Sequence, residues 1–73
     1  MDIRERVNNL LSEDCKDKLD GFDDFELQRI HEHTLMNDGC KIIDIYRNSR
    51  SHSVVELKIE KENGNKDAFC LIL

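Results

Sequence analysis

The spacing of apolar residues changes once along this 73-residue chain, and that change limits the fold more than any other feature. Up to Gly39 the apolar residues recur every three or four positions, which is the period of a helix that buries one face. After Gly39 they alternate with polar residues or form short continuous runs, as they do in strands. We therefore predict helices in the first half of the chain and strands in the second.

The first helix is predicted over residues 3–19, with Asp2 as its N-cap. Its apolar residues lie on one face and charged or amide side chains fill the other. Ser12 could cap the chain a second time and so divide this helix into two shorter pieces. Gly21, after Asp20, is a suitable place for the segment to stop.

The second helix has the strongest local signal in the chain. Asp23 stands where an N-cap belongs, and Glu26 three residues later can reach back to the N–H of the cap, which together form a capping box. The helix is predicted to begin at Asp24 and to end in a left-handed turn at residues 37–39. Its predicted apolar side consists of Phe25, Leu27, Ile30, Thr34 and Leu35.

Three strands are predicted after the helices, at 40–47, 53–61 and 67–73. The segment 62–66 contains Asn-Gly, which favours a tight antiparallel hairpin. The fold class is therefore α+β in two layers, in which an N-terminal helical hairpin packs on a three-stranded antiparallel meander sheet (ααβββ). The whole chain, 1–73, is expected to form a single domain.

The middle strand is expected to turn Val55, Leu57 and Ile59 toward the helices. The outer two strands carry apolar residues on both sides, so a second apolar set would lie on the face away from the helices. Beside an unpaired edge, such a face suits a partner or a homodimer that pairs through an edge strand. The predicted partner or dimer face consists of Ile42, Tyr46, Cys70 and Ile72.

The charge is uneven along the chain. The formal net charge is −5, and residues 1–38 alone sum to −6, from eleven acids and five bases. Because an acidic surface repels phosphates, direct nucleic-acid binding is disfavoured and a protein partner with a basic surface is favoured. The alternative is a solvated surface whose acids stabilise helix N-termini. The predicted acidic face consists of Glu13, Asp14, Asp17, Asp20, Asp23 and Asp24.

One basic cluster, formed by Arg47, Arg50 and His52, flanks the turn between the first two strands. It supports an alternative function as a small nucleic-acid-binding regulator, with these residues as phosphate or RNA contacts. A further alternative is a small nuclease or toxin in which His52 is the acid or base.

The cysteines predict neither disulfides nor a zinc site, since Cys15, Cys40 and Cys70 are odd in number and far apart. His31 and His33 would point away from each other on a helix, so no metal site and no cofactor are expected. The last four residues match a prenylation pattern, which we interpret as the end of an apolar strand. With no leader or membrane-spanning run, a cytoplasmic location is expected.

These features favour a non-enzymatic interaction protein that inhibits or modulates a larger partner, because so small a core leaves little room for an enclosed substrate pocket. Residues with AT-rich codons predominate, which indicates a low-GC bacterium, its phages or its mobile elements. In size, acidity and lack of catalytic motifs the chain is similar to small phage-encoded inhibitors, such as anti-CRISPR or anti-restriction proteins. That resemblance implies a protein-binding function, with acidic residues that could mimic nucleic acid.

Overall fold

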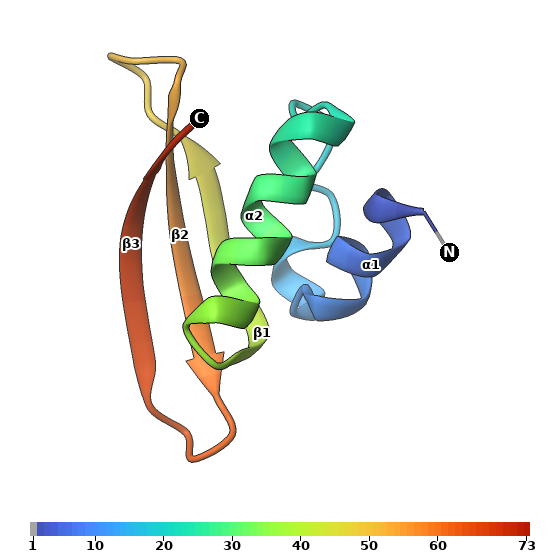
Figure 1. Cartoon of the computed structure of the whole chain (residues 1–73), viewed down its shortest axis with the longest axis vertical. Coiled ribbons are helices and arrows are strands. Elements are labelled where there is room, and N and C mark those ends of the chain that lie inside the picture. The colour runs from blue at the N-terminus through green and yellow to red at the C-terminus, as the bar shows by residue number, and fades with distance from the viewer. Residues whose placement is uncertain (1) are drawn as a thin grey trace.

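The computed structural model describes residues 2–73 and confirms the α+β fold class (Figure 1). The strands form one antiparallel sheet in the order β1-β2-β3, and the helices pack on one of its faces. Each strand begins and ends within one residue of its predicted bounds. The elements are α1 (Ile3–Leu10), the 3-10 turn η1 (Glu13–Cys15), α2 (Asp24–Met36), β1 (Gly39–Arg47), β2 (Val54–Lys61) and β3 (Lys66–Ile72).

Helix α2 begins with the predicted capping box. The backbone N–H of Glu26 donates to Asp23 Oδ1 at 2.8 Å, and the backbone N–H of Asp23 donates to Glu26 Oε1 at 3.1 Å. These two bonds satisfy two of the N–H groups that a helix start leaves without an intrahelical partner. The predicted start of the helix at Asp24 is confirmed.

The turn after α2 is left-handed at Asp38, whose φ is 60°, and Gly39 already belongs to β1. A Cβ atom on Gly39 would lie 2.8 Å from Thr34 Cγ2 and 2.9 Å from Ile59 Cδ1. Real Cβ atoms do not approach other atoms so closely, so glycine is required here for packing. It allows β1 to start directly against the last turn of α2.

Helix α1 is shorter than predicted, because it ends at Leu10 rather than near residue 19. Leu11 is extended and forms a parallel bridge with Ile42 of β1, and the N–H of Ser12 donates to the carbonyl of Ile42 at 2.9 Å. Pairing with the edge of β1 thus replaces helical bonds at the point where Ser12 was expected to break the helix. The later apolar residues of this segment still reach the core from η1 and the turns.

Strand β1 shifts its register against β2 twice, between Gly39 and Lys41 and again between Ile42 and Asp44, and the sequence analysis predicted neither shift. The second is a bulge that determines which side chains reach the core. There β1 advances by two residues while β2 advances by one, so Ile43 is an extra residue. The bulge shifts the alternation of side chains, and both Ile42 and Ile45 face the helices with no exposed surface. The prediction that Ile42 lies on the outer face of the sheet is therefore wrong.

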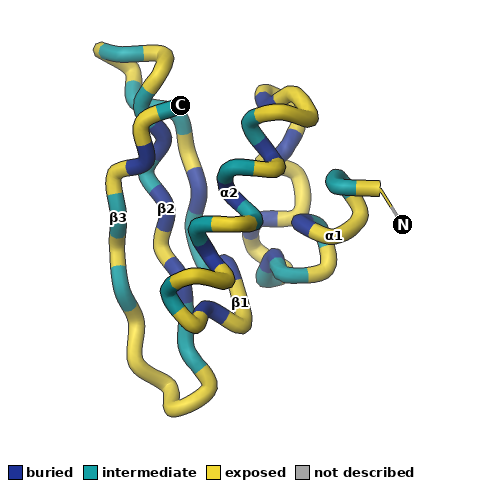
Figure 2. Tube along the Cα trace, viewed as in Figure 1, coloured by how far each residue is buried: buried dark blue, intermediate teal, exposed yellow. Residues whose placement is uncertain are grey.

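The buried core lies between the sheet and the helices (Figure 2). Strand β2 contributes Val55, Leu57 and Ile59 to it, as predicted. Phe25 and Leu35, predicted on the buried side of α2, are instead 68% and 53% exposed. A helix that packs on a sheet buries one stripe of its surface, and these two residues lie beyond the borders of that stripe.

Replacing Leu57 with Ala should lower the free energy of unfolding by about 2–5 kcal/mol, because the substitution leaves a cavity in the middle strand. Chemical denaturation measures the change, and Lys58→Ala, at the exposed neighbouring position, serves as the control. Equal midpoints for the two variants would contradict the position of Leu57 in the core.

Candidate interaction surfaces

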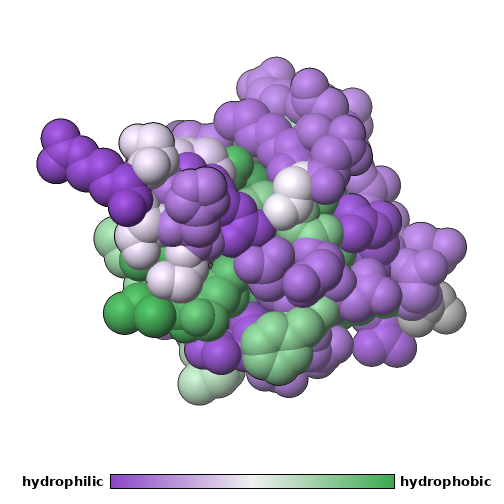
Figure 3. All heavy atoms as spheres, turned by 90° about the horizontal axis from the view of Figure 1, so that it is seen from above, coloured by the Kyte–Doolittle hydropathy of each residue, from purple (hydrophilic) through white to green (hydrophobic). Residues whose placement is uncertain are grey.

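The six predicted acidic residues lie in the connection between the helices and at the start of α2. Glu13 and Asp14 begin η1, Asp17 and Asp20 lie in the turns that follow, and Asp23 and Asp24 lead into α2. All six side chains are exposed. Hydrophilic residues cover this helical side of the molecule in the view from above (Figure 3).

The lysines of the same segment are bound to other parts of the chain. Lys16 Nζ donates to the carbonyl of Asn8 at 2.8 Å, and Lys18 Nζ forms an ion pair with Asp44 of β1, also at 2.8 Å. This pairing lowers the pKa of Asp44 and raises that of Lys18. Within residues 2–73, no ion pair involves any of the six acidic side chains. The segment therefore presents carboxylates whose charge its own lysines do not pair.

Arg47, predicted as a nucleic-acid contact, binds its own chain. Its guanidinium donates two bonds of 2.9 Å to the carboxylate of Glu26 and one of 2.7 Å to the carbonyl of Gly21. It also donates to the carbonyl of His52 and lies 4.8 Å from the centre of the Phe22 ring. These contacts join the end of β1 to the start of α2.

The other two residues of the predicted basic cluster remain exposed in the turn between β1 and β2. The side chain of Asn48 accepts hydrogen bonds from the backbone N–H groups of Arg50 and Ser51, which holds the turn in a defined shape. Of the three cluster residues, only Arg50 and His52 thus extend into solvent.

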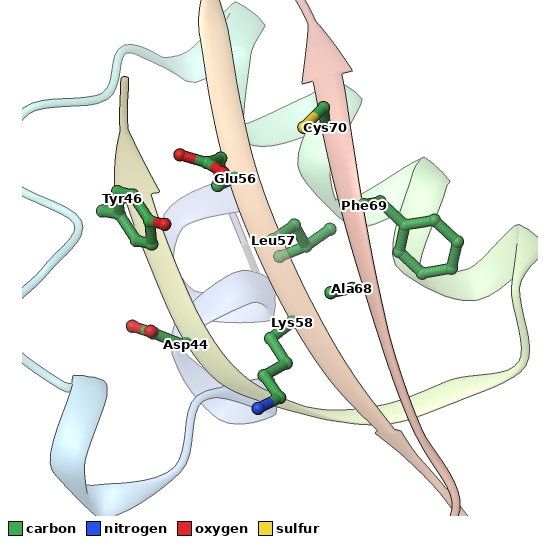
Figure 4. A pocket seen from close by; sticks show the side chains of 8 residues that line it. All are labelled: Asp44, Tyr46, Glu56, Leu57, Lys58, Ala68, Phe69 and Cys70. Atoms are coloured by element: carbon green, nitrogen blue, oxygen red, sulfur yellow. The ribbon is translucent and has the colours of Figure 1, made fainter. Parts of the chain in front are cut away.

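The outer face of the sheet carries a shallow groove of about 310 Å³ (Figure 4). Tyr46, Glu56 and Cys70 form one row across the three strands, and Asp44, Lys58 and Ala68 form the next. Hydrogen bonding to the Glu56 carboxylate raises the pKa of Tyr46. The groove therefore offers a ligand the carboxylates of Asp44 and Glu56, the ammonium group of Lys58 and the partly exposed side chain of Tyr46.

Three of the four residues predicted for the outer face are exposed. Tyr46 is 49% exposed and Ile72 is 69% exposed, and Cys70 is exposed as well. They do not form one apolar patch, because Glu56 and Lys58 of β2 interrupt the face. The sequence analysis considered only the apolar residues of this face and missed its charged centre, although the alternation along residues 54–60 indicates it.

The two edges of the sheet differ. Leu11 and Ser12 cover part of the edge of β1, and Cys15 Sγ donates to the carbonyl of Ile43 at 3.2 Å. At the edge of β3, among the described residues, a single side-chain hydrogen bond occurs, from Arg29 Nη2 to the carbonyl of Ile72 at 3.1 Å. Strand β3 is thus the open edge.

No group of three His, Cys, Asp or Glu side chains in residues 2–73 is arranged to hold a metal ion. His33 instead packs edge-on against Phe69 of β3, with the ring centres 4.9 Å apart. Neither helix, within the part of the chain that is described, combines the length and the hydropathy needed to cross a membrane.

No protein-family model matches this chain, and no curated protein and no solved structure shows significant similarity to it. The geometry defines the class of the molecule, a small two-layer α+β protein with a helical hairpin on a meander sheet. Its function is inferred below from the charges, hydrogen bonds and exposed side chains of its surfaces.

The pair formed by Arg47 and Glu26 predicts a pH dependence of stability. Hydrogen bonding to Arg47 lowers the pKa of Glu26 in the folded protein below its usual value of 4.5. The stabilisation is therefore complete above pH 4.5 and is lost as the pH falls through the folded-state pKa. Glu26→Gln keeps the capping box but removes the charge, so it should cost about 1–2 kcal/mol at pH 7 and much less at pH 3.

Denaturation at the two pH values measures this difference. Glu62→Gln is the control, because Glu62 is exposed and forms no ion pair among the described residues. An equal cost for Glu26→Gln at pH 7 and pH 3 would contradict a stabilising role for the ion pair.

Proposed function

We propose that this protein is a non-enzymatic interaction protein that binds a larger protein with a basic surface and inhibits or modulates it. The observation that carries the proposal is the exposed acidic segment, residues 13–24, in which six carboxylates have no ion-pair partner among the described residues. Lys16 and Lys18, which could neutralise them, bind Asn8 and Asp44 instead.

Unpaired charges of one sign suit such a role for a physical reason. They attract a basic surface over about one Debye length, speed association and favour one orientation of the partner. Spaced carboxylates on a compact domain can also occupy a groove that normally binds phosphates, which makes a nucleic-acid-binding protein a suitable target. We propose that this binding takes place in the cytoplasm.

The alternative function, a nucleic-acid-binding regulator, has weaker support. Arg47 is engaged with Glu26 and with two backbone carbonyls, so Arg50 and His52 would have to supply the contacts. One arginine and one neutral histidine neutralise few phosphates. The geometry therefore favours the acidic segment as the functional surface.

We also propose that the chain forms a homodimer through the edge of β3. The support for this is the open edge itself, together with the exposed Ile72 at its end. Unpaired strand edges promote strand pairing between chains, and a small domain gains stability when such an edge is covered.

Reversal of three acidic charges tests the partner surface. Asp17, Asp20 and Asp24 replaced together by Lys should weaken partner binding at least about tenfold, because the new like-charge contacts oppose association. The immobilised protein is exposed to bacterial lysate, and the captured proteins are quantified by mass spectrometry at increasing salt. Capture by the unaltered protein should decline as salt rises.

The control variant carries Lys at Glu5, Glu60 and Glu62, which lie outside the acidic segment; Glu5 and Glu62 are exposed and Glu60 is half-buried. Both variants change three acids to bases, so each shifts the net charge from −5 by six units to +1. Loss of the same captured proteins from both variants, or from neither, would move the binding surface away from residues 13–24.

A further inference from the structure

The open edge of β3 offers a defined set of backbone groups. Leu73 N–H donates to the carbonyl of Ser53, and Lys61 N–H donates to the carbonyl of Asn65. Because bonding direction alternates along an antiparallel strand, the odd-numbered residues of β3 face β2. The N–H and C=O groups of the even-numbered residues therefore point to the open edge. These residues are Lys66, Ala68, Cys70 and Ile72.

A stripe of exposed and half-buried side chains on α2 lies beside that edge. We call Phe25, Arg29, Glu32 and Met36 the α2 stripe; at 3.6 residues per turn they lie within roughly 60° of one another around the helix. Arg29 bonds to the carbonyl of Ile72, which places the stripe next to β3. Phe25 is 68% and Met36 81% exposed.

The α2 stripe is complementary to itself. A twofold axis through the midpoint of the stripe, between residues 30 and 31, would exchange Phe25 with Met36 and Arg29 with Glu32. Each apolar end would then meet the other apolar end, and each arginine a glutamate. A twofold interface requires this kind of self-complementarity, since one surface serves both subunits.

We propose that two copies of this chain pair around that axis, with β3 antiparallel to β3 and the two α2 stripes side by side above the joined sheet. In this dimer Phe25 contacts Met36 of the partner subunit. Arg29 exchanges its bond to the Ile72 carbonyl for an ion pair with Glu32 of the partner subunit, which frees that carbonyl for strand pairing. This inference rests on the homodimer proposed above and adds α2, the register and the charge pairing.

The register of β3 follows from two separate observations. His33 contacts Phe69 and Arg29 contacts Ile72, so the midpoint of the stripe lies opposite Cys70 and Leu71. Residues 68–72 are all apolar, and they pair entirely with one another when the axis passes through Cys70. Both observations centre the pairing at or next to Cys70.

This interface leaves most of the acidic segment free, because only its last residue, Asp24, adjoins the α2 stripe. Strand β3 lies at one side of the molecule, and α1 with the segment that follows it lies at the other, with α2 between them (Figure 1). The dimer therefore carries two acidic segments on its outer sides, where each can bind a partner.

A charge exchange tests the proposal. Sedimentation of the unaltered chain should give about twice the 8.6 kDa monomer mass. Arg29→Glu and Glu32→Arg should each raise the dimer dissociation constant at least about tenfold, because each places like charges together. The double variant Arg29→Glu/Glu32→Arg should restore the dimer. Exchange of Glu5 and Lys16, which are exposed on the other side, is the control.

Disulfide formation tests the register without altering the stripe. In this register the two Cys70 residues form a hydrogen-bonded pair. The Cα atoms of such a pair in antiparallel strands are about 5.5 Å apart, a separation that a disulfide spans. Diamide, which accepts the two electrons and two protons, should link two Cys70 thiols. The product should persist in Cys40→Ser and disappear in Cys70→Ser.

The outcomes separate the two proposals. A monomer at all concentrations overturns the homodimer and this inference with it. A dimer whose dissociation constant is unchanged by both single charge reversals, or is not restored by the double variant, would contradict the role of the α2 stripe. Pairing through β3 would remain consistent with that result. If the backbone amides of β3 are protected from hydrogen exchange only when a captured protein is present, the open edge of β3 binds that protein instead of a second copy.

Discussion

The extra residue in β1 is the feature on which the two-layer arrangement depends. By inserting Ile43 between two register positions, the bulge turns both Ile42 and Ile45 toward the helices. It also presents the carbonyl of Ile42 to Ser12 and that of Ile43 to Cys15. The helical half of the chain is thus bound to β1 by the buried side chains of Ile42 and Ile45 and by hydrogen bonds to the carbonyls of Ile42 and Ile43. A regular strand would expose one of these isoleucines and turn one of these carbonyls away.

Features that depend on neighbouring residues could be predicted from the sequence, whereas the bulge could not. The capping box at Asp23, the left-handed turn at Asp38 and the glycine hairpin at Gly64 depend on neighbouring residues, and such local signals predict element boundaries well. The bulge and the early end of α1 depend on a contact between Leu11 and Ile42, which lie far apart in the sequence. The periodicity of apolar residues within one segment carries no information about such a contact.

The candidate surfaces show the same limit. The acidic residues were found from composition, and all six are exposed. The roles of the basic residues could not be found from composition, because tertiary neighbours decide whether an arginine faces solvent or binds its own chain. Arg47 stacks on Phe22 and binds Glu26, and Arg4 binds the carbonyl of Leu19. Both lysines of the acidic segment bind other parts of the chain at the surface. These basic groups are thus engaged within the chain, whereas the six carboxylates of the acidic segment form no ion pair among the described residues.

The unequal edges of the sheet have a consequence for how far assembly can proceed. A sheet with two open edges can add strands at both ends and extend without limit, as fibrils do. Here Leu11 and Ser12 cover part of the edge of β1 and obstruct strand addition there, whereas the edge of β3 is open. Joining two such edges leaves only obstructed edges at the ends of the enlarged sheet. In the proposed dimer, the short segment that ends α1 early would therefore terminate strand addition and limit assembly to a closed pair instead of a polymer.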